Sequence, residues 1–199
     1  MGLRDLEGAV DGRRAKGERR RRALIEATLR VVERDGAAGV SHRTVSREAG
    51  LPTSASTYYF AGVDDLLTAA LTSCMTEDAS NVRAIAAAPG DPRRALAEQL
   101  RHICTSPGRL VAEYELFLLA ARRPELREST DHWMAAVTDF ARRFTVDPVR
   151  VRVFVGALDG LLIQALLTDA PPSTEEWEAM IRDLLPGPCL APTTPGRPA

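Results

Sequence analysis

The chain has 199 residues, 45% of them hydrophobic, and its 26 Lys and Arg residues nearly balance 27 Asp and Glu residues at a net charge of −1. No stretch reaches the ~18 uninterrupted apolar residues of a membrane span, and no apolar signal core follows the arginine-rich N-terminus. We therefore expect a cytoplasmic protein without a membrane partner. Its length suffices for one helical body, or for a small domain beside a larger one.

The positive charge is concentrated near the N-terminus. Residues 13–22 hold seven basic side chains and one acid, a local charge of +6. Residues 1–60 carry 12 basic against 8 acidic residues, net +4, whereas the rest carries 14 against 19, net −5. Basic side chains that neutralise phosphates release counterions and give sequence-independent affinity for DNA. Taken alone, such a run is more often a solvated helix start or tail.

A polar stretch that follows reads as two short helices joined at a glycine. Ser41 is a suitable N-cap with Thr44 three residues later. Gly50 ends this first helix, because glycine readily takes the left-handed conformation of a sharp turn. Pro52 is pre-set for a first helical turn, so a second helix is predicted over residues 53–59.

The second helix carries small hydroxyl side chains followed by two tyrosines, Tyr58 and Tyr59. Hydroxyl groups bind phosphate oxygens, Ser and Thr also reach base edges, and the major groove admits an α-helix. A short helix rich in Ser and Thr is, by itself, more often a plain polar surface. The adjacent basic run favours DNA binding.

Over residues 17–71 these features resemble the TetR (tetracycline-repressor) family of bacterial transcription regulators. The family order of a basic first helix, a short loop, a capped second helix and a polar recognition helix is present. So is its pattern of Ala49-Gly50-Leu51, an aromatic cluster ending in Phe60, and an acidic-aliphatic helix start at residues 64–67. The resemblance implies an all-α fold: a three-helix DNA-binding head with a helix-turn-helix, then a helical domain for ligand binding and dimerisation.

The resemblance also implies, position by position, which residues contact DNA: Arg20, Ser41, Arg43, Thr44, Thr53, Ser54, Ala55, Thr57, Tyr58 and Tyr59. Three positions depart from the family pattern. Ser56 stands where an aliphatic residue is common, Thr57 where tyrosine is common, and Val63 where a phosphate-contacting lysine is common. The operator sequence therefore cannot be inferred by analogy.

We expect four segments along the chain: a disordered basic arm at 1–16, the DNA-binding domain at 17–62, an effector-binding and dimerisation domain at 63–185, and a disordered proline-rich tail at 186–199. Proline and glycine punctuation with helical periodicity predicts nine helices and no strand. Beyond the first three, these cover residues 63–88, 92–105, 109–122, 126–144, 148–168 and 174–185.

The helix expected over residues 148–168 is apolar on nearly all sides, and Gly156 and Gly160 lie four residues apart on one face. Such a helix is buried, either in an ordinary core or against a second copy. We favour a homodimer, because the family pairs this helix with the next one into a four-helix interface. The candidate interface residues are Val153, Gly156, Gly160, Ile163, Leu167, Trp177 and Ile181. A dimer would present two recognition helices to a palindromic operator, with half-sites about 34 Å or a multiple apart.

The family binds small-molecule effectors between the head and the dimer helices. Large apolar and polar side chains there suit a pocket: Met75, Asp78, His102, Glu113, Tyr114, Phe117, Trp133 and Met134. The same residues suit core packing at helical spacing. The function implied is that of a repressor released from its operator by a small molecule.

The sequence also bears on two other classes of function, an enzyme and a thiol redox sensor. The three histidines are scattered, with no phosphate-binding glycine loop and no nucleophile motif, so we expect neither an enzyme nor a metal or cofactor. A thiol redox sensor is a subtler alternative, in which oxidation of Cys74 and Cys104 replaces ligand binding as the trigger. Buried cysteines more commonly act as small apolar residues.

Overall fold

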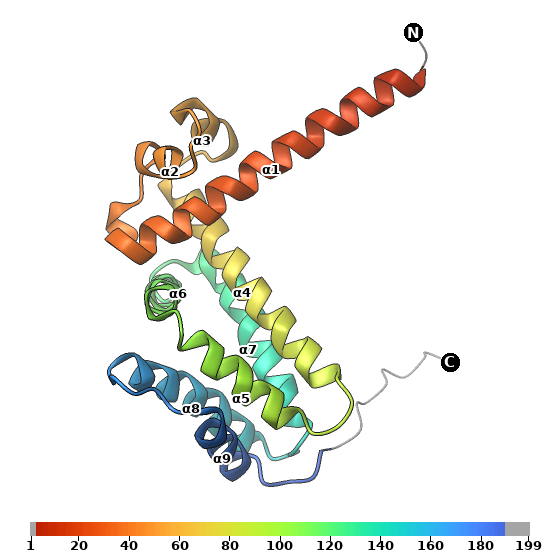
Figure 1. Cartoon of the computed structure of the whole chain (residues 1–199), viewed down its shortest axis with the longest axis vertical. Coiled ribbons are helices and arrows are strands. Elements are labelled where there is room, and N and C mark those ends of the chain that lie inside the picture. The colour runs from red at the N-terminus through yellow and green to blue at the C-terminus, as the bar shows by residue number, and fades with distance from the viewer. Residues whose placement is uncertain (1–2, 190–199) are drawn as a thin grey trace. The chain divides into compact units, whose positions relative to one another are not determined.

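A computed structural model describes residues 3–189, which form nine α-helices and two short 3₁₀ helices and contain no strand (Figure 1). The expected all-α class is confirmed. The elements are α1 (Leu3–Asp35), η1 (Ala37–Gly39), α2 (His42–Glu48), α3 (Thr53–Tyr59), α4 (Val63–Ala87), α5 (Pro92–Ile103), α6 (Pro107–Leu119), η2 (Pro124–Leu126), α7 (Arg127–Arg142), α8 (Pro148–Leu166) and α9 (Thr174–Leu184).

The chain divides into two compact units. The first holds the residues up to Ser73 together with Val111–Leu126, and the second holds Cys74–Leu110 and the residues from Arg127 onward. Both α4 and α6 run from one unit into the other. The domain boundary expected after residue 62 lies at the start of α4. The division between the two units falls instead within α4 and again within α6.

Local caps set the helix ends in the first unit. The Ser41 hydroxyl accepts a hydrogen bond from the Thr44 amide at 3.1 Å, and the Thr44 hydroxyl accepts one from the Ser41 amide at 2.9 Å. These two bonds form the capping box that starts α2. At the other end Gly50 has φ +64°, the left-handed conformation that a residue with a side chain rarely adopts.

The second half of α6 is anchored within the first unit by two polar contacts. The Glu115 carboxylate accepts a hydrogen bond from the Ala37 amide at 2.7 Å, next to Gly36 with φ +73°. Beyond the helix, Arg123 pairs with Asp64 at 2.6 Å. The loop between α1 and α2 and the start of α4 are thereby fixed to the segment 111–126.

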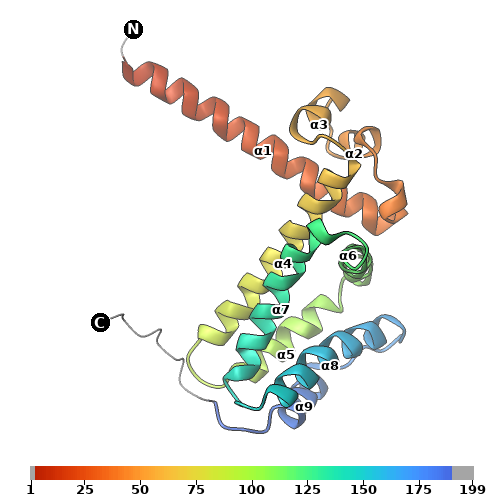
Figure 2. The same ribbon diagram turned by 180° about the vertical axis from the view of Figure 1, so that it is seen from behind.

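The core of the second unit lies where α5 packs on α9 and α7 on α8 (Figure 2). Phe140 of α7 stacks on Phe154 of α8 with ring centroids 6.0 Å apart. Arg93 of α5 is buried, lies over the Phe144 ring at 4.7 Å, and donates to the carbonyl of Leu185 at 2.7 Å. Arg93 thus ties the end of α9 to the start of α5.

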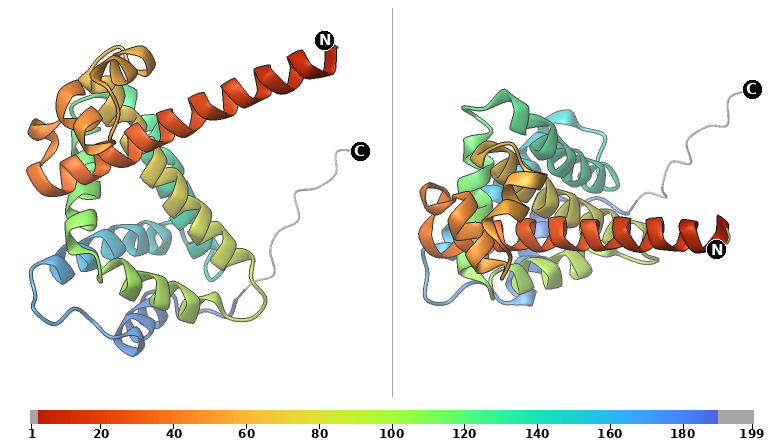
Figure 3. Two further views of the ribbon diagram at one scale, coloured as in Figure 1. Left: turned by 45° about the horizontal axis from the view of Figure 1, so that its top comes forward. Right: turned by 90° about the horizontal axis from the view of Figure 1, so that it is seen from above.

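Two expectations about the termini need correction. Helix α1 begins at Leu3 and extends well past α2 and α3 (Figure 3), so residues 3–16 are helical, not a disordered arm. This stretch has no proline, and three Arg, two Leu and two Ala residues in it are good helix formers, so a helix formed further along can propagate through it. At the other end Gly187 accepts a hydrogen bond from Arg93 at 3.2 Å, so the expected tail is anchored at its start. Residues 190–199 of that tail lie outside the described residues.

Candidate nucleic-acid interface

Helix α3 exposes most of the side chains that the sequence assigned to DNA. Thr53, Ser54 and Thr57 are exposed, and Tyr58 is 81% exposed, whereas Ala55 is half-buried. A tyrosine side chain that is this exposed, at the end of a helix, can contact a binding partner. The buried residue that follows, Phe60, fixes the end of the helix in the core of its unit.

A partly buried hydrogen bond joins α3 to α2. Ser56 is fully buried, and its hydroxyl lies 2.8 Å from Nδ1 of His42, which is half-buried. This contact accounts for a serine at a position where the family commonly has an aliphatic residue, because the buried hydroxyl has a hydrogen-bond partner. Sequence reasoning missed it, because the two residues lie on different helices and His42 reads as an isolated histidine.

Tyr59 and the α2 cap residues have structural contacts of their own. The Tyr59 ring meets that of Tyr58 edge-on at a centroid distance of 4.9 Å. The Tyr59 hydroxyl lies close to Gly17 of α1. A Cβ atom added to Gly17 would be 3.5 Å from this hydroxyl. The hydroxyls of Ser41 and Thr44 are engaged in the capping box. The DNA contacts assigned to these three residues therefore stay predictions.

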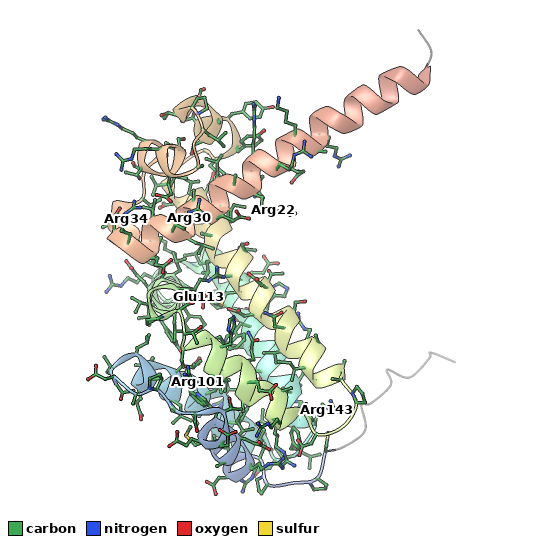
Figure 4. All side chains as sticks on the ribbon, in the orientation of Figure 1. Arg22, Arg30, Arg34, Arg101, Glu113 and Arg143 are labelled. Atoms are coloured by element: carbon green, nitrogen blue, oxygen red, sulfur yellow. The ribbon has the colours of Figure 1, made fainter. Side chains whose placement is uncertain are left out.

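Two arginines of α1 form ion pairs with α2. Arg30 and Arg34, at the C-terminal end of α1 (Figure 4), hold Glu48 of α2 at 2.9 and 2.8 Å. These hydrogen bonds, that from Arg34 foremost, lower the pKa of Glu48. Arg20 on α1 and Arg43 on α2 are exposed, as Arg30 and Arg34 are.

Arg47 on α2 is also exposed, and it was not among the residues predicted from the sequence to contact DNA. It follows Arg43 by four residues on α2, and both side chains are exposed. Residues at this spacing lie on the same side of a helix. The signal that could have revealed it is the repeat of an arginine at i and i+4 in a helix that precedes a recognition helix.

The eight candidate effector residues divide between the units. Glu113, Tyr114 and Phe117 belong to the first unit, with Glu113 buried and the other two half-buried. In the second unit, Met75 and Trp133 are buried, Asp78 is half-buried, and His102 and Met134 are exposed. A groove of about 720 Å³ between α7 and α8 is lined by Met134, Thr138, Arg142, Val146, Pro148, Val151, Arg152, Val155, Gly156 and Asp159. Of the eight candidates, Met134 alone lines this groove.

The candidate dimer residues separate by exposure. Val153, Ile163 and Leu167 are 53%, 44% and 84% exposed, and Gly156 is exposed while Gly160 is half-buried. Trp177 and Ile181, by contrast, are 0% and 1% exposed within their own unit. The expectation for these two is corrected, because α9 buries that face against its own α5.

None of the three cysteines forms a disulfide. Cys74 is fully buried, and burial raises the pKa of the Cys104 thiol against the opposing influence of Arg101. Both effects make a thiol less reactive, which gives the redox alternative no support. Within the described residues, no helix is long and apolar enough to cross a membrane, and no cluster of three or more His, Cys, Asp or Glu could hold a metal ion.

Residues 88–187 match the family model described as the tetracyclin repressor-like, C-terminal domain. A solved structure of a TetR-family member from Streptomyces coelicolor A3 is 38% identical and has a TM-score of 0.73, and the match covers 84% of this chain and 98% of that chain. The chain belongs to the TetR family. The family expected from the sequence is thereby confirmed, and the protein is a TetR-family transcriptional regulator.

Two further relatives of this TetR-family regulator are informative. The multidrug binding protein EbrR, solved in complex with ethidium, is 39% identical with a TM-score of 0.67, over 84% of this chain and 99% of that chain. The HTH-type transcriptional regulator PksA of Bacillus subtilis (strain 168) is 29% identical over 100 residues, which is 50% of this chain and 49% of that protein. The chain thus spans about half the length of this curated relative.

Proposed function

We propose that this TetR-family regulator is a homodimeric repressor that binds a palindromic DNA operator through α2 and α3 and is released by a small molecule. The observation that carries the proposal is the exposed face of α3, where Thr53, Ser54, Thr57 and Tyr58 offer hydroxyl, methyl and aromatic groups to a groove. A helix of this kind fits the major groove of B-form DNA.

The exposed arginines supply the electrostatic part of the interaction. Arg43 and Arg47 stand exposed on α2 beside α3, and Arg20 stands exposed on α1. Each phosphate that such a side chain neutralises releases counterions, so affinity should fall steeply as salt rises. The base-facing surface of α3 then adds sequence preference to this general attraction.

DNA binding is tested by selecting sequences from random duplex DNA with the purified protein and titrating the recovered fragment across a salt series. Tyr58→Ala and Arg43→Ala should each weaken binding by about fivefold or more, the usual effect of losing one base or phosphate contact. Arg122→Ala, an exposed arginine beyond the end of α6, is the matched control and should bind like the wild type. Recovery of no preferred sequence would count against the proposal.

A stripe on α8 supports the homodimer. Its members are Val149, Val153, Gly156, Gly160, Ile163 and Leu167, at alternating spacings of four and three residues. Val149 is 69% exposed, and the large members are all more than two-fifths exposed to solvent. Such a row of solvent-exposed apolar side chains at heptad spacing is typical of a helix that packs against another helix.

The two glycines suggest how two copies of α8 pair. An added Cβ at Gly156 or Gly160 would meet no atom within 4 Å, so neither glycine is required by packing inside its own chain. Antiparallel helices related by a two-fold axis between Gly156 and Gly160 would bring the backbones close there. Val153 would then face Ile163 of the second copy, and Val149 would face Leu167.

Sedimentation velocity of the wild type and of Ile163→Glu tests the dimer. The buried charge should dissociate the dimer, because an unpaired carboxylate in an apolar interface is strongly unfavourable. Leu118→Glu is the matched control, since Leu118 on α6 is 66% exposed and lies off the stripe. Dissociation by the control, or an unchanged dimer in Ile163→Glu, would place the interface elsewhere.

Release by a small molecule is supported by the relatives. EbrR, which is 37% to 39% identical to this chain, is a multidrug binding protein solved in complex with imidazole, ethidium, malachite green and proflavin. A ligand that favours a DNA-incompetent conformation lowers operator affinity, and the operator must lower ligand affinity by the same factor.

The ligand is sought by calorimetric titration of the DNA-free protein with malachite green. Met134→Ala, in the groove between α7 and α8, should weaken binding, whereas Leu118→Ala should not. The titration is then repeated with operator duplex and with an equal amount of scrambled duplex, which corrects for dye bound to DNA. Weaker dye binding in the presence of the operator alone is the expected result, and equal binding would contradict release by this ligand class.

A further inference from the structure

The recognition helix contains no side chain that makes a bidentate contact with a base. Residues 53–59 are Thr, Ser, Ala, Ser, Thr, Tyr and Tyr, without Arg, Lys, Asn, Gln, Asp or Glu. Guanine is usually read by Arg or Lys, and adenine by Asn or Gln. On α3, direct reading of base edges is therefore left to hydroxyl and methyl groups.

The side chain of Thr57 has a defined orientation in this surface. Thr57 is exposed, and its hydroxyl donates back along its own helix to the carbonyl of Ser54 at 3.3 Å, with the carbonyl of Thr53 at 3.5 Å. A β-branched side chain on a helix has few allowed rotamers. Because the hydroxyl proton is directed to the backbone of α3, the γ-methyl group occupies a different staggered position and is available to a partner.

A methyl group has one distinctive counterpart in the major groove. Thymine alone among the four bases carries a methyl group there, at C5, and the methyl group of threonine is a known kind of apolar contact for it. A tyrosine, the residue common in the family at this position, has no methyl group to offer.

We propose that Thr57 determines part of the operator specificity by packing its γ-methyl group against the C5-methyl group of a thymine in each half-site. This inference rests on the proposed DNA-binding function and specifies the base that α3 selects. The Thr57 hydroxyl contributes to the conformation of the side chain and not to the contact.

The test is a double-mutant cycle that combines variants of the protein with variants of the DNA fragment recovered by selection. Thr57→Val keeps the methyl group without the hydroxyl, and Thr57→Ser keeps the hydroxyl without the methyl group. On the DNA, each thymine is replaced in turn by deoxyuridine, which removes only the C5-methyl group. Circular dichroism confirms that the two variants, changed at an exposed position, are folded.

Each half-site should contain one thymine that responds. Replacing it in one half-site should lower the affinity of the wild type by about fourfold, as expected for one buried methyl group. Thr57→Val should respond to that replacement like the wild type. Thr57→Ser removes the methyl group from both subunits, so it should bind the thymine operator about sixteenfold more weakly and show no further loss with deoxyuridine.

Other outcomes overturn the inference and leave DNA binding intact: no thymine responds, or Thr57→Ser keeps the full response, or Thr57→Val loses it. In each of these cases a specific operator exists but Thr57 does not read a methyl group. Recovery of no preferred sequence at all would instead overturn the proposed function, and this inference with it.

Discussion

At the scale of single residues, the contact between His42 and Ser56 sets the junction of α2 and α3. Ser56 is fully buried, and its hydroxyl lies 2.8 Å from the His42 ring nitrogen. A buried hydroxyl that loses its partner keeps its desolvation cost. The pair therefore constrains how α3 is held relative to α2, and with it the direction of the exposed face of α3.

The pair can be measured by a double-mutant cycle in urea. We expect Ser56→Ala and His42→Ala each to lower the free energy of unfolding, by about 1–2 kcal/mol, because each removes the hydrogen bond and His42→Ala leaves the buried Ser56 hydroxyl unsatisfied. The double variant should lose less than the sum, with a coupling energy of about 1 kcal/mol. A coupling energy near zero would show that the two side chains do not stabilise one another.

Asp91 gives a second prediction at this scale. Hydrogen bonds from Arg93 foremost, and from Arg182, hold the pKa of Asp91 well below its usual range. A carboxylate with a lowered pKa in the folded state stabilises the fold above its unfolded pKa, about 3.9 for Asp, and loses that contribution as the pH falls through the folded pKa.

The stability of the wild type should therefore exceed that of Asp91→Asn by a constant amount at neutral pH. The difference should shrink as the pH falls below about 4, where the unfolded carboxylate becomes protonated. Urea unfolding at a series of pH values measures it, with Asp183→Asn, an exposed change on α9, as the control. A difference that grows toward low pH would contradict the assigned ion pairs.

At the scale of whole elements, local signals predicted helix bounds well. Helix α3 was predicted at residues 53–59 and forms as Thr53–Tyr59, because Gly50 and Pro52 mark the turn before it. The face of α9 was predicted less well. Trp177 and Ile181 lie one turn apart and so must share a face, but the spacing does not say whether the neighbouring helix is α5 or a partner's helix. Contacts between helices distant in sequence, such as that of Ser56 with His42, carry no local signal at all.

Helix α1 supplies the prediction at this scale. Arg20 is exposed, so Arg20→Gln should reduce the slope of log affinity against log salt by about 1 for each subunit that contacts a phosphate. Arg34→Gln is the control on the same helix, because Arg34 is held by Glu48 at 2.8 Å and Asp35 at 2.9 Å. An unchanged slope in Arg20→Gln would remove this residue from the DNA interface.

At the scale of the molecule, the first unit exposes α3 and the second unit exposes the apolar stripe on α8. The TetR family and the all-α fold were predictable from the helix-turn-helix and its flanking pattern. The effector residues were not, since large apolar and polar side chains at helical spacing fit a core and a pocket equally well. Two copies joined at α8 would carry two recognition helices, and the operator should then share their two-fold symmetry.

Hydroxyl-radical footprinting of the protein on its selected DNA shows whether a dimer binds a palindrome. We expect two protected half-sites of inverted sequence, with centres about one helical turn of 10–10.5 base pairs, or a multiple, apart. Ile163→Glu should abolish the paired protection. A single protected half-site, or protection that ignores sequence, would contradict a dimeric regulator that reads a palindromic operator.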